Sequence, residues 1–131
     1  QMGDFNKAEY YFDRVMKKIY TIPTKEIEDT WRVLNILFHT GVFYAEISEL
    51  ESSNALLEYA ITICSENHIT YYLARAAFQL TLNSIEEKKE LSRCLELLYD
   101  ARAYAKINKN DVLLKKISTI EKNLLKQQEG N

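Results

Sequence analysis

Apolar residues recur three and four positions apart through nearly the whole chain, and this spacing limits the fold more than any other feature. The first such stretch carries them at Ala8, Tyr11, Phe12, Val15 and Ile19. Side chains spaced in this way share one face of an α-helix, and no clean alternation of apolar and polar residues competes with the pattern. Only three glycines and one proline are present, too few for the many turns of an all-β domain. The sequence therefore predicts an all-α protein.

Turn and cap signals divide the chain into about six helices. Pro23 ends the first helix, because the residue before a proline avoids the helical region. Thr24 is placed to cap a second helix that runs from about residue 25 to about residue 47. Short connections of this kind force successive helices to lie antiparallel.

Further signals mark the remaining helices. The segments 48–51 and 84–87 both read as capping boxes, in which a serine is followed by a glutamate three residues later, and each is expected to start a helix. Asn83 and Ser84 are expected to break the helix before the second box. Residues 65–68 read as a turn, and 108–111 as a turn with a cap before the final helix.

Length and composition indicate one globular domain over residues 1–131. The chain is 47% apolar and 27% charged, which is typical of a folded domain rather than a disordered one. A net charge of −2 argues against direct nucleic-acid contact, since domains that bind nucleic acid by bulk charge are usually basic. Cys64 and Cys94 are too few for a disulfide framework, and we expect reduced, buried thiols.

The chain shows no sign of a membrane or secretory segment. Its most apolar stretch, 33–45, contains Asn35, His39 and Thr40 and is well short of the roughly 20 residues that cross a bilayer. The first twenty residues mix charged and aromatic side chains, unlike a signal peptide. We therefore expect a cytoplasmic protein without membrane contact.

One segment near the start of the chain carries a specific motif. It resembles the turn and second helix of a tetratricopeptide repeat, through Gly3, Asp4, Phe5, Ala8, Phe12 and Val15. The small–large–small pattern of that helix recurs twice, at Ser53, Leu57 and Ala60 and again at Cys94, Leu98 and Ala101. Patterns similar to the first helix of the repeat occur at Leu37, Gly41 and Tyr44 and, more weakly, at Leu73, Ala77 and Leu80.

The resemblance implies packing and architecture. A small residue lets two helices approach closely, and the large residue four positions later fills the groove beside it. Ala8, Ser53 and Cys94 lie 45 and 41 residues apart, so the hairpins are longer than the usual repeat of about 34 residues. The implied fold is a right-handed stack of antiparallel helical hairpins, with the helix from residue 111 to about 127 as its C-terminal cap.

The resemblance also implies a binding surface. In tetratricopeptide repeats the first helix of each hairpin lines an inner groove, where extended peptides dock. The corresponding residues of this chain are Asn35, Phe38, His39, Val42, Tyr71, Arg75 and Phe78. Asn35 can pair with a peptide bond, Arg75 can bind a carboxylate through two parallel bonds, and the aromatic rings offer apolar area. The alternative is that Phe38 and Phe78 belong to the core between hairpins.

Long, degenerate repeats with a terminal helix are similar to the C-terminal sensor domain of Rgg/PlcR-type bacterial transcription regulators. That resemblance implies a ligand-sensing module that binds a short peptide or protein segment and forms a homodimer. It also implies that this chain is the C-terminal part of a longer protein, in which DNA is bound only by a preceding helix-turn-helix domain. A general protein–protein interaction scaffold and a small helical enzyme or metal-binding bundle are the alternatives.

The residues that could carry chemistry form no recognisable catalytic motif. Cys64 and His68 stand four apart and would share a helix face if the helix continued, but a zinc site needs more ligands. His39 has no identifiable nucleophile or orienting acid around it. Glycine occurs only at positions 3, 41 and 130, so the sequence contains no glycine-rich loop that could bind a phosphate. We expect no catalytic residue, metal or cofactor.

Overall fold

The computed structural model describes residues 14, 17 and 27–129 of the chain. Within this part every extended element is helical: α2 (Ile27–Glu46), α3 (Leu50–Glu66), α4 (Tyr71–Glu86), α5 (Leu91–Ile107) and α6 (Asp111–Glu129). No strand occurs among these residues, and the prediction of an all-α fold is confirmed. The helix expected over 8–19, and the glycine–aspartate–phenylalanine segment before it, lie outside the described residues.

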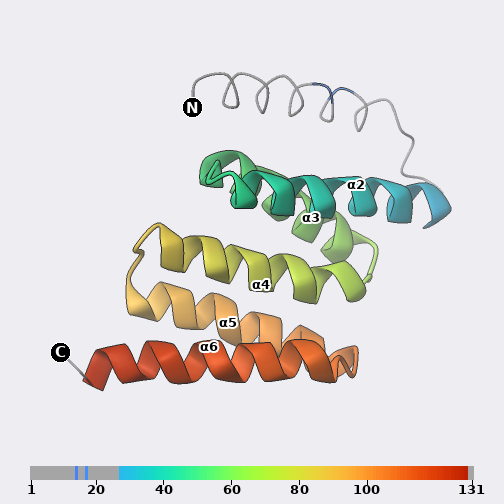
Figure 1. Ribbon diagram of the computed structural model, residues 1–131. Coiled ribbons are helices and arrows are strands. Elements are labelled where there is room, and N and C mark those ends of the chain that lie inside the picture. The colour runs from blue at the N-terminus through green and yellow to red at the C-terminus, as the bar shows by residue number, and fades with distance from the viewer. Residues whose placement is uncertain (1–13, 15–16, 18–26, 130–131) are drawn as a thin grey trace.

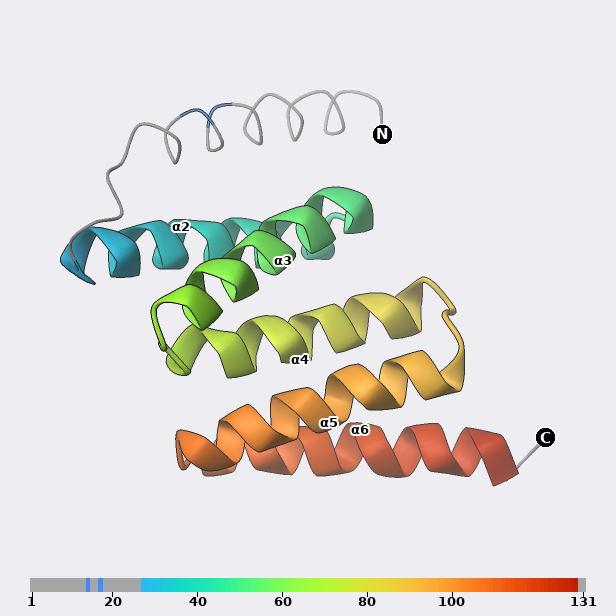
Figure 2. The same ribbon diagram turned by 180° about the vertical axis from the view of Figure 1, so that it is seen from behind.

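Successive helices run antiparallel and lie side by side in a row from α2 to α6 (Figure 1). Each helix contacts the next one along the chain, and α2 also contacts α4. The helices α2, α4 and α6 lie toward one side of the row, and α3 and α5 lie toward the other, which Figure 2 shows from behind. This arrangement gives the molecule two distinct faces.

Four similar turns reverse the chain. In each, one residue that is not glycine takes a left-handed backbone conformation, with φ of 61° at Ser48, 56° at His68, 59° at Lys88 and 55° at Lys109. The next backbone N–H donates back into the helix just completed, for example from Glu49 to the carbonyl of Tyr44 at 2.8 Å. This six-to-one bond is the mark of a Schellman motif, which satisfies carbonyl groups that a helix end leaves open.

The two capping boxes expected from the sequence are wrong. Ser48 ends α2 instead of starting α3, and α3 begins after Glu49 without a side-chain cap. The second segment, 84–87, is the end of α4 instead of the start of a new helix: α4 continues through Asn83 and Ser84 to Glu86, and Glu87 is its C-cap. The cap expected in 108–111 is present, since Asn110 Oδ1 accepts a hydrogen bond from the Leu113 N–H at 3.1 Å.

Asn83 does not break α4 because its amide finds partners inside the protein. Its Nδ2 donates to Ser53 Oγ at 2.9 Å and to Asn54 Oδ1 at 2.8 Å, while its Oδ1 accepts from Gln79 Nε2 at 3.0 Å. A helix-breaking tendency comes from competition for backbone groups, and a side chain already bonded elsewhere does not compete. The buried amide therefore fixes α4 against α3.

The close approach of α2 and α3 depends on Gly41. A Cβ atom there would lie 2.9 Å from both Cγ and Cδ2 of Leu57. Ser53 Oγ donates to the Gly41 carbonyl at 2.7 Å, which joins the two backbones at the same point. The packing that we inferred from the small and large residues of these helices is confirmed at this crossing.

The apolar residues form adjoining clusters along the row. One cluster is shared by α2, α3 and α4 and includes Leu34, Leu37 and Ile63. The next is shared by α4, α5 and α6 and includes Leu98, Ile117 and Leu124. None of the described helices combines the length and the apolar character that a bilayer crossing requires.

Candidate functional site

Four aromatic rings from α2 and α4 form a connected group, which we call the aromatic cluster: Trp31, Phe38, Tyr71 and Tyr72. The ring centroids of Trp31 lie 5.8 Å from Tyr71 and 5.5 Å from Tyr72. Those of Phe38 and Tyr72 are 5.7 Å apart, and the two tyrosines meet edge to face at 5.0 Å. Such distances are favourable for aromatic pairs.

The aromatic cluster is partly open to solvent. Trp31 is 37% exposed and Tyr71 is 43% exposed, whereas Tyr72 is buried and Phe38 is half-buried. Phe38 and Tyr71 are among the binding residues expected from the sequence, whereas Trp31 and Tyr72 are not. Tyr72 follows Tyr71 directly on α4, but only the contact between α2 and α4 brings Trp31 and Phe38 to the two tyrosines, and no local pattern signals that contact.

Arg75 lies beside the aromatic cluster. Its Cζ sits 4.4 Å from the centroid of the Tyr71 ring, one helical turn earlier on α4, which is a cation–π arrangement. The Nε atom is buried and has no hydrogen-bond partner, and among the described residues no carboxylate pairs with this guanidinium. Buried polar groups are rarely left unsatisfied, and each needs an explanation.

Asn35 is already engaged with the aromatic cluster. Its Nδ2 donates to the hydroxyl of Tyr72 at 2.9 Å. An amide carries two donors and one acceptor oxygen, so this bond leaves further capacity on the same side chain, which is exposed. The structure thus brings Asn35, Phe38, Tyr71 and Arg75 of the predicted binding residues into one neighbourhood.

The other three predicted residues lie differently. His39 is exposed, with its ring 5.3 Å from that of Phe38, and Val42 is half-buried one turn further along α2. Phe78 is half-buried and packs against the cluster of α4, α5 and α6. Phe38 also packs against buried residues, so the alternative of a core role has a basis for both phenylalanines.

Cys64 and His68 do not share a helix face. α3 ends at Glu66, and His68 is the exposed left-handed residue of the following turn. Cys64 is buried, and this burial raises the pKa of its thiol to about 11, which keeps it in the unreactive thiol form at neutral pH. In the described part of the chain, no three or more His, Cys, Asp or Glu side chains gather where they could hold a metal ion.

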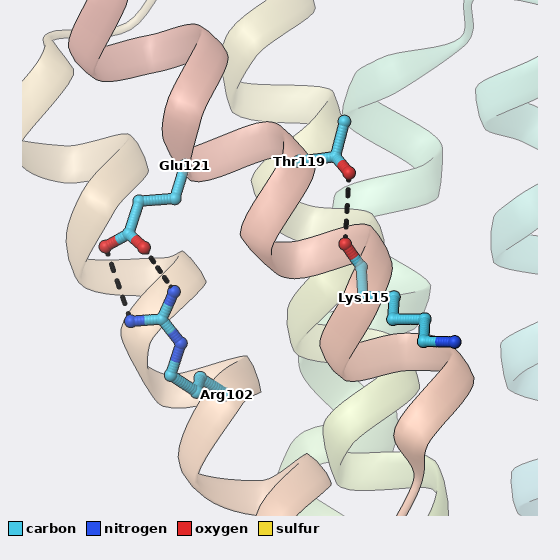
Figure 3. A network of polar contacts seen from close by, with 4 residues as sticks. All are labelled: Arg102, Lys115, Thr119 and Glu121. Carbon is cyan, nitrogen blue, oxygen red and sulfur yellow. Dashed lines mark hydrogen bonds and ion pairs between the residues drawn. The ribbon is translucent and has the colours of Figure 1, made fainter.

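An ion pair that was not expected from the sequence joins α6 to α5. Arg102 donates through both terminal nitrogens to the carboxylate of Glu121, with Nη1 3.3 Å from Oε2 (Figure 3). The hydrogen bond from Arg102 lowers the pKa of Glu121. The neighbouring Glu121 carboxylate raises the pKa of the Tyr99 phenol. Within α6, Thr119 Oγ1 donates to the Lys115 carbonyl at 3.1 Å (Figure 3).

The aromatic cluster with Arg75 and Asn35 is the arrangement best suited to bind a ligand by shape and charge. It offers apolar area, a cation that has no anionic partner among the described residues and an amide with open hydrogen-bonding capacity. Comparison of the chain with protein-family models, with curated proteins and with solved structures found no match.

Proposed function

We propose that this chain is a non-catalytic, tetratricopeptide-like helical repeat module that binds a peptide or protein segment across α2 and α4. The observation that carries the proposal is Arg75, whose buried Nε has no hydrogen-bond partner in the described part of the chain and lies next to the exposed rings of Trp31 and Tyr71. A carboxylate of the bound segment would pair with this guanidinium, while apolar side chains would cover the two rings.

A repeat architecture is supported by contacts that recur along the chain. Ser48 Oγ donates to Glu86 Oε1, and Thr70 Oγ1 donates to Asn108 Oδ1; the two residues of each pair are 38 positions apart. The four turns have the same backbone form and follow one another at near-equal spacing. We infer a right-handed stack of antiparallel hairpins of about this period, in which α6 is the terminal cap.

The chemistry of the α2–α4 face fits an extended peptide. Such a ligand presents amide groups at regular intervals, and Asn35 has the donor and acceptor capacity to pair with one of them. We propose that His39, Val42 and Phe78 extend the same surface beyond the aromatic cluster. The rings contribute contact area at low cost in side-chain entropy, because an aromatic side chain has few rotatable bonds.

In its most specific form the proposal is a peptide sensor of the Rgg/PlcR type. The module would then act in the cytoplasm as a homodimer, and would reach DNA only through a helix-turn-helix domain outside this sequence. The alternative is a general protein–protein interaction scaffold, which would use the same face for a segment of a folded partner and would not need a signalling peptide.

Thermal stability measured with an array of short synthetic peptides tests the proposal. A ligand that binds only the folded state raises the melting temperature in a saturable way. We expect one or more apolar peptides with a free carboxylate to do so for the wild type, and to lose the effect with Arg75→Gln. Arg32→Gln is the matched control, since Arg32 is exposed and pairs with Asp29 at 3.7 Å.

The outcomes separate the peptide sensor from the protein–protein interaction scaffold. If no peptide stabilises the wild type, the sensor function is wrong. If peptides stabilise the wild type and Arg75→Gln equally, the site is not where we place it. The scaffold alternative is favoured if a folded partner protein binds the chain without any peptide and the binding is lost with Trp31→Ala and Arg75→Gln.

A further inference from the structure

A second candidate site lies on the opposite side of the row, where α3 and α5 flank α4 (Figure 2). A hollow of about 230 Å³ opens there. Its walls are Asn54 and Glu58 of α3 and Arg93 and Leu97 of α5, its floor includes Leu80 of α4, and the turn between α4 and α5 adds Glu87 and Lys89. None of these residues belongs to the aromatic cluster.

Charges of both signs line this hollow without pairing. Glu58 and Glu87 are acidic and Lys89 and Arg93 are basic, yet among the described residues no ion pair joins them. Arg93 instead contacts the exposed carboxylate of Glu96 at 3.4 Å. A ligand that carries both signs would complement these charges.

One wall of the hollow is held in place by the buried amide network. Asn54 Oδ1 accepts from Asn83 Nδ2 at 2.8 Å, and Asn54 Nδ2 donates to Glu87 Oε1 at 3.0 Å. Asn83 is itself buried and bonded on both sides. A carboxylate positioned in advance loses less entropy when a ligand binds. The Glu87 carboxylate is therefore oriented through two amides that reach into the core.

The base of the hollow is apolar. Leu80 is buried and Leu97 is half-buried, so the hollow combines an apolar base with a charged rim. Small-molecule sites commonly have this combination, in which apolar area supplies affinity and a few charged groups fix orientation. The ligand should therefore carry an apolar side chain besides its two charges.

We propose that this hollow binds a free α-amino acid with an apolar side chain. Glu58 and Glu87 hold its ammonium group, Lys89 and Arg93 hold its carboxylate, and its side chain rests on Leu80 and Leu97. A free amino acid carries both charges on one small molecule, whereas a fully extended peptide separates its termini by roughly 3.3–3.6 Å for each residue. This site is independent of the peptide face on α2 and α4.

Titration of the isotope-labelled full chain with L-leucine, followed by amide NMR spectra, tests the proposal. We expect saturable shifts in the amides of α3, α4 and α5 that line the hollow. N-acetyl-L-leucine lacks the ammonium group and L-leucinamide lacks the carboxylate, so both should bind at least about tenfold more weakly, as loss of one charge-assisted contact predicts. Absence of saturable shifts with L-leucine overturns the proposal, as do equal shifts from all three compounds.

Variants at the rim locate the site. Glu58→Gln and Arg93→Gln should each weaken L-leucine binding about tenfold. Both positions are exposed, so neither change should disturb folding, and the spectrum of each variant checks this. Glu66→Gln is the matched control, because Glu66 is exposed on the same helix as Glu58 but does not line the hollow. Unchanged affinity in both rim variants places the ligand elsewhere and overturns the assignment.

Discussion

Thr70 and Asn108 exchange two hydrogen bonds between neighbouring turns along one edge of the helical row. Thr70 Oγ1 donates to Asn108 Oδ1 at 2.6 Å, and Asn108 Nδ2 donates back to the Thr70 carbonyl at 2.8 Å. Thr70 is the residue before α4, and Asn108 is the residue after α5. This pair therefore closes the α4–α5 hairpin at the end away from its own turn.

Replacing Asn108 should destabilise the protein through this hairpin. Asn108→Ala removes both bonds and leaves the Thr70 carbonyl without this partner, and we expect a loss of about 1–3 kcal/mol in the free energy of unfolding. Urea unfolding monitored by circular dichroism measures it. Asn123→Ala, at an exposed position on α6, is the control and should change stability by less than about 0.5 kcal/mol. Equal stability of the two variants would show that the pair contributes nothing.

The packing at Gly41 gives a second test. Gly41→Ala gains about 1 kcal/mol of helix propensity, but its Cβ would stand 2.9 Å from Leu57 Cγ. Leu57 is fully buried and cannot move aside without disturbing its neighbours, and overpacking costs about 1–3 kcal/mol. We therefore expect a net loss of stability in urea unfolding.

A double mutant separates the clash from other effects of the alanine. Leu57→Ala alone should cost about 2–5 kcal/mol. If the clash is the cause, Gly41→Ala should become neutral or stabilising when Leu57 is already alanine, because the contact is gone. Strict additivity of the two changes would contradict the contact as the source of the loss.

The sequence predicted the helices and their apolar faces but not how each helix ends. Helix periodicity is a local property that each segment carries by itself, and the small residues Gly41 and Ser53 marked a helix crossing correctly. Ser48 looked like a cap in the sequence, but it ends the preceding helix in a left-handed conformation. A serine side chain suits either role, and only the hydrogen bond from Glu49 back to Tyr44 decides between them.

The candidate site was predictable only in part for a similar reason. Tyr71 and Arg75 stand one turn apart, so their proximity follows from the helix alone. Trp31 reaches them only when α2 and α4 pack together, and the hollow beside Asn54 needs three helices and a turn. Asn83 illustrates the limit, because its local preference favours a turn while its buried partners keep it helical.

Replacing a left-handed turn residue by glycine should stabilise the protein. Lys88 and Lys109 have φ of 59° and 55°, a conformation that costs a side-chain-bearing residue about 1–2 kcal/mol and costs glycine nothing. Part of this gain is lost because glycine is more flexible in the unfolded chain. Lys88→Gly and Lys109→Gly should each stabilise by about 0.5–1 kcal/mol in urea unfolding.

A lysine within a helix is the matched control for these two variants. Lys116 lies exposed inside α6, where glycine should destabilise by about 1 kcal/mol. Opposite signs at the turn and helix positions are the expected result. Destabilisation by Lys88→Gly would mean that its left-handed conformation does not persist in solution.

The ion pair between Arg102 and Glu121 predicts how stability depends on pH. The hydrogen bond from Arg102 lowers the pKa of Glu121 below its ordinary value of 4.5. A carboxyl group whose pKa is lower in the folded state stabilises the fold above its unfolded value, and this contribution disappears as the pH falls through the folded value. Arg102 keeps its charge throughout. The stabilisation should thus be complete at pH 7 and should decline as the pH drops below about 4.5.

Urea unfolding midpoints from pH 7 to pH 3 check this dependence. Glu121→Gln should be less stable than the wild type at pH 7, and the difference should shrink as the pH falls, because protonation removes the charge that the variant already lacks. Glu96→Gln is the control, since its pair with Arg93 is widely exposed and exposed pairs contribute little. A difference between wild type and Glu121→Gln that stays constant from pH 7 to pH 3 would show that the charge of Glu121 does not hold α6 against α5.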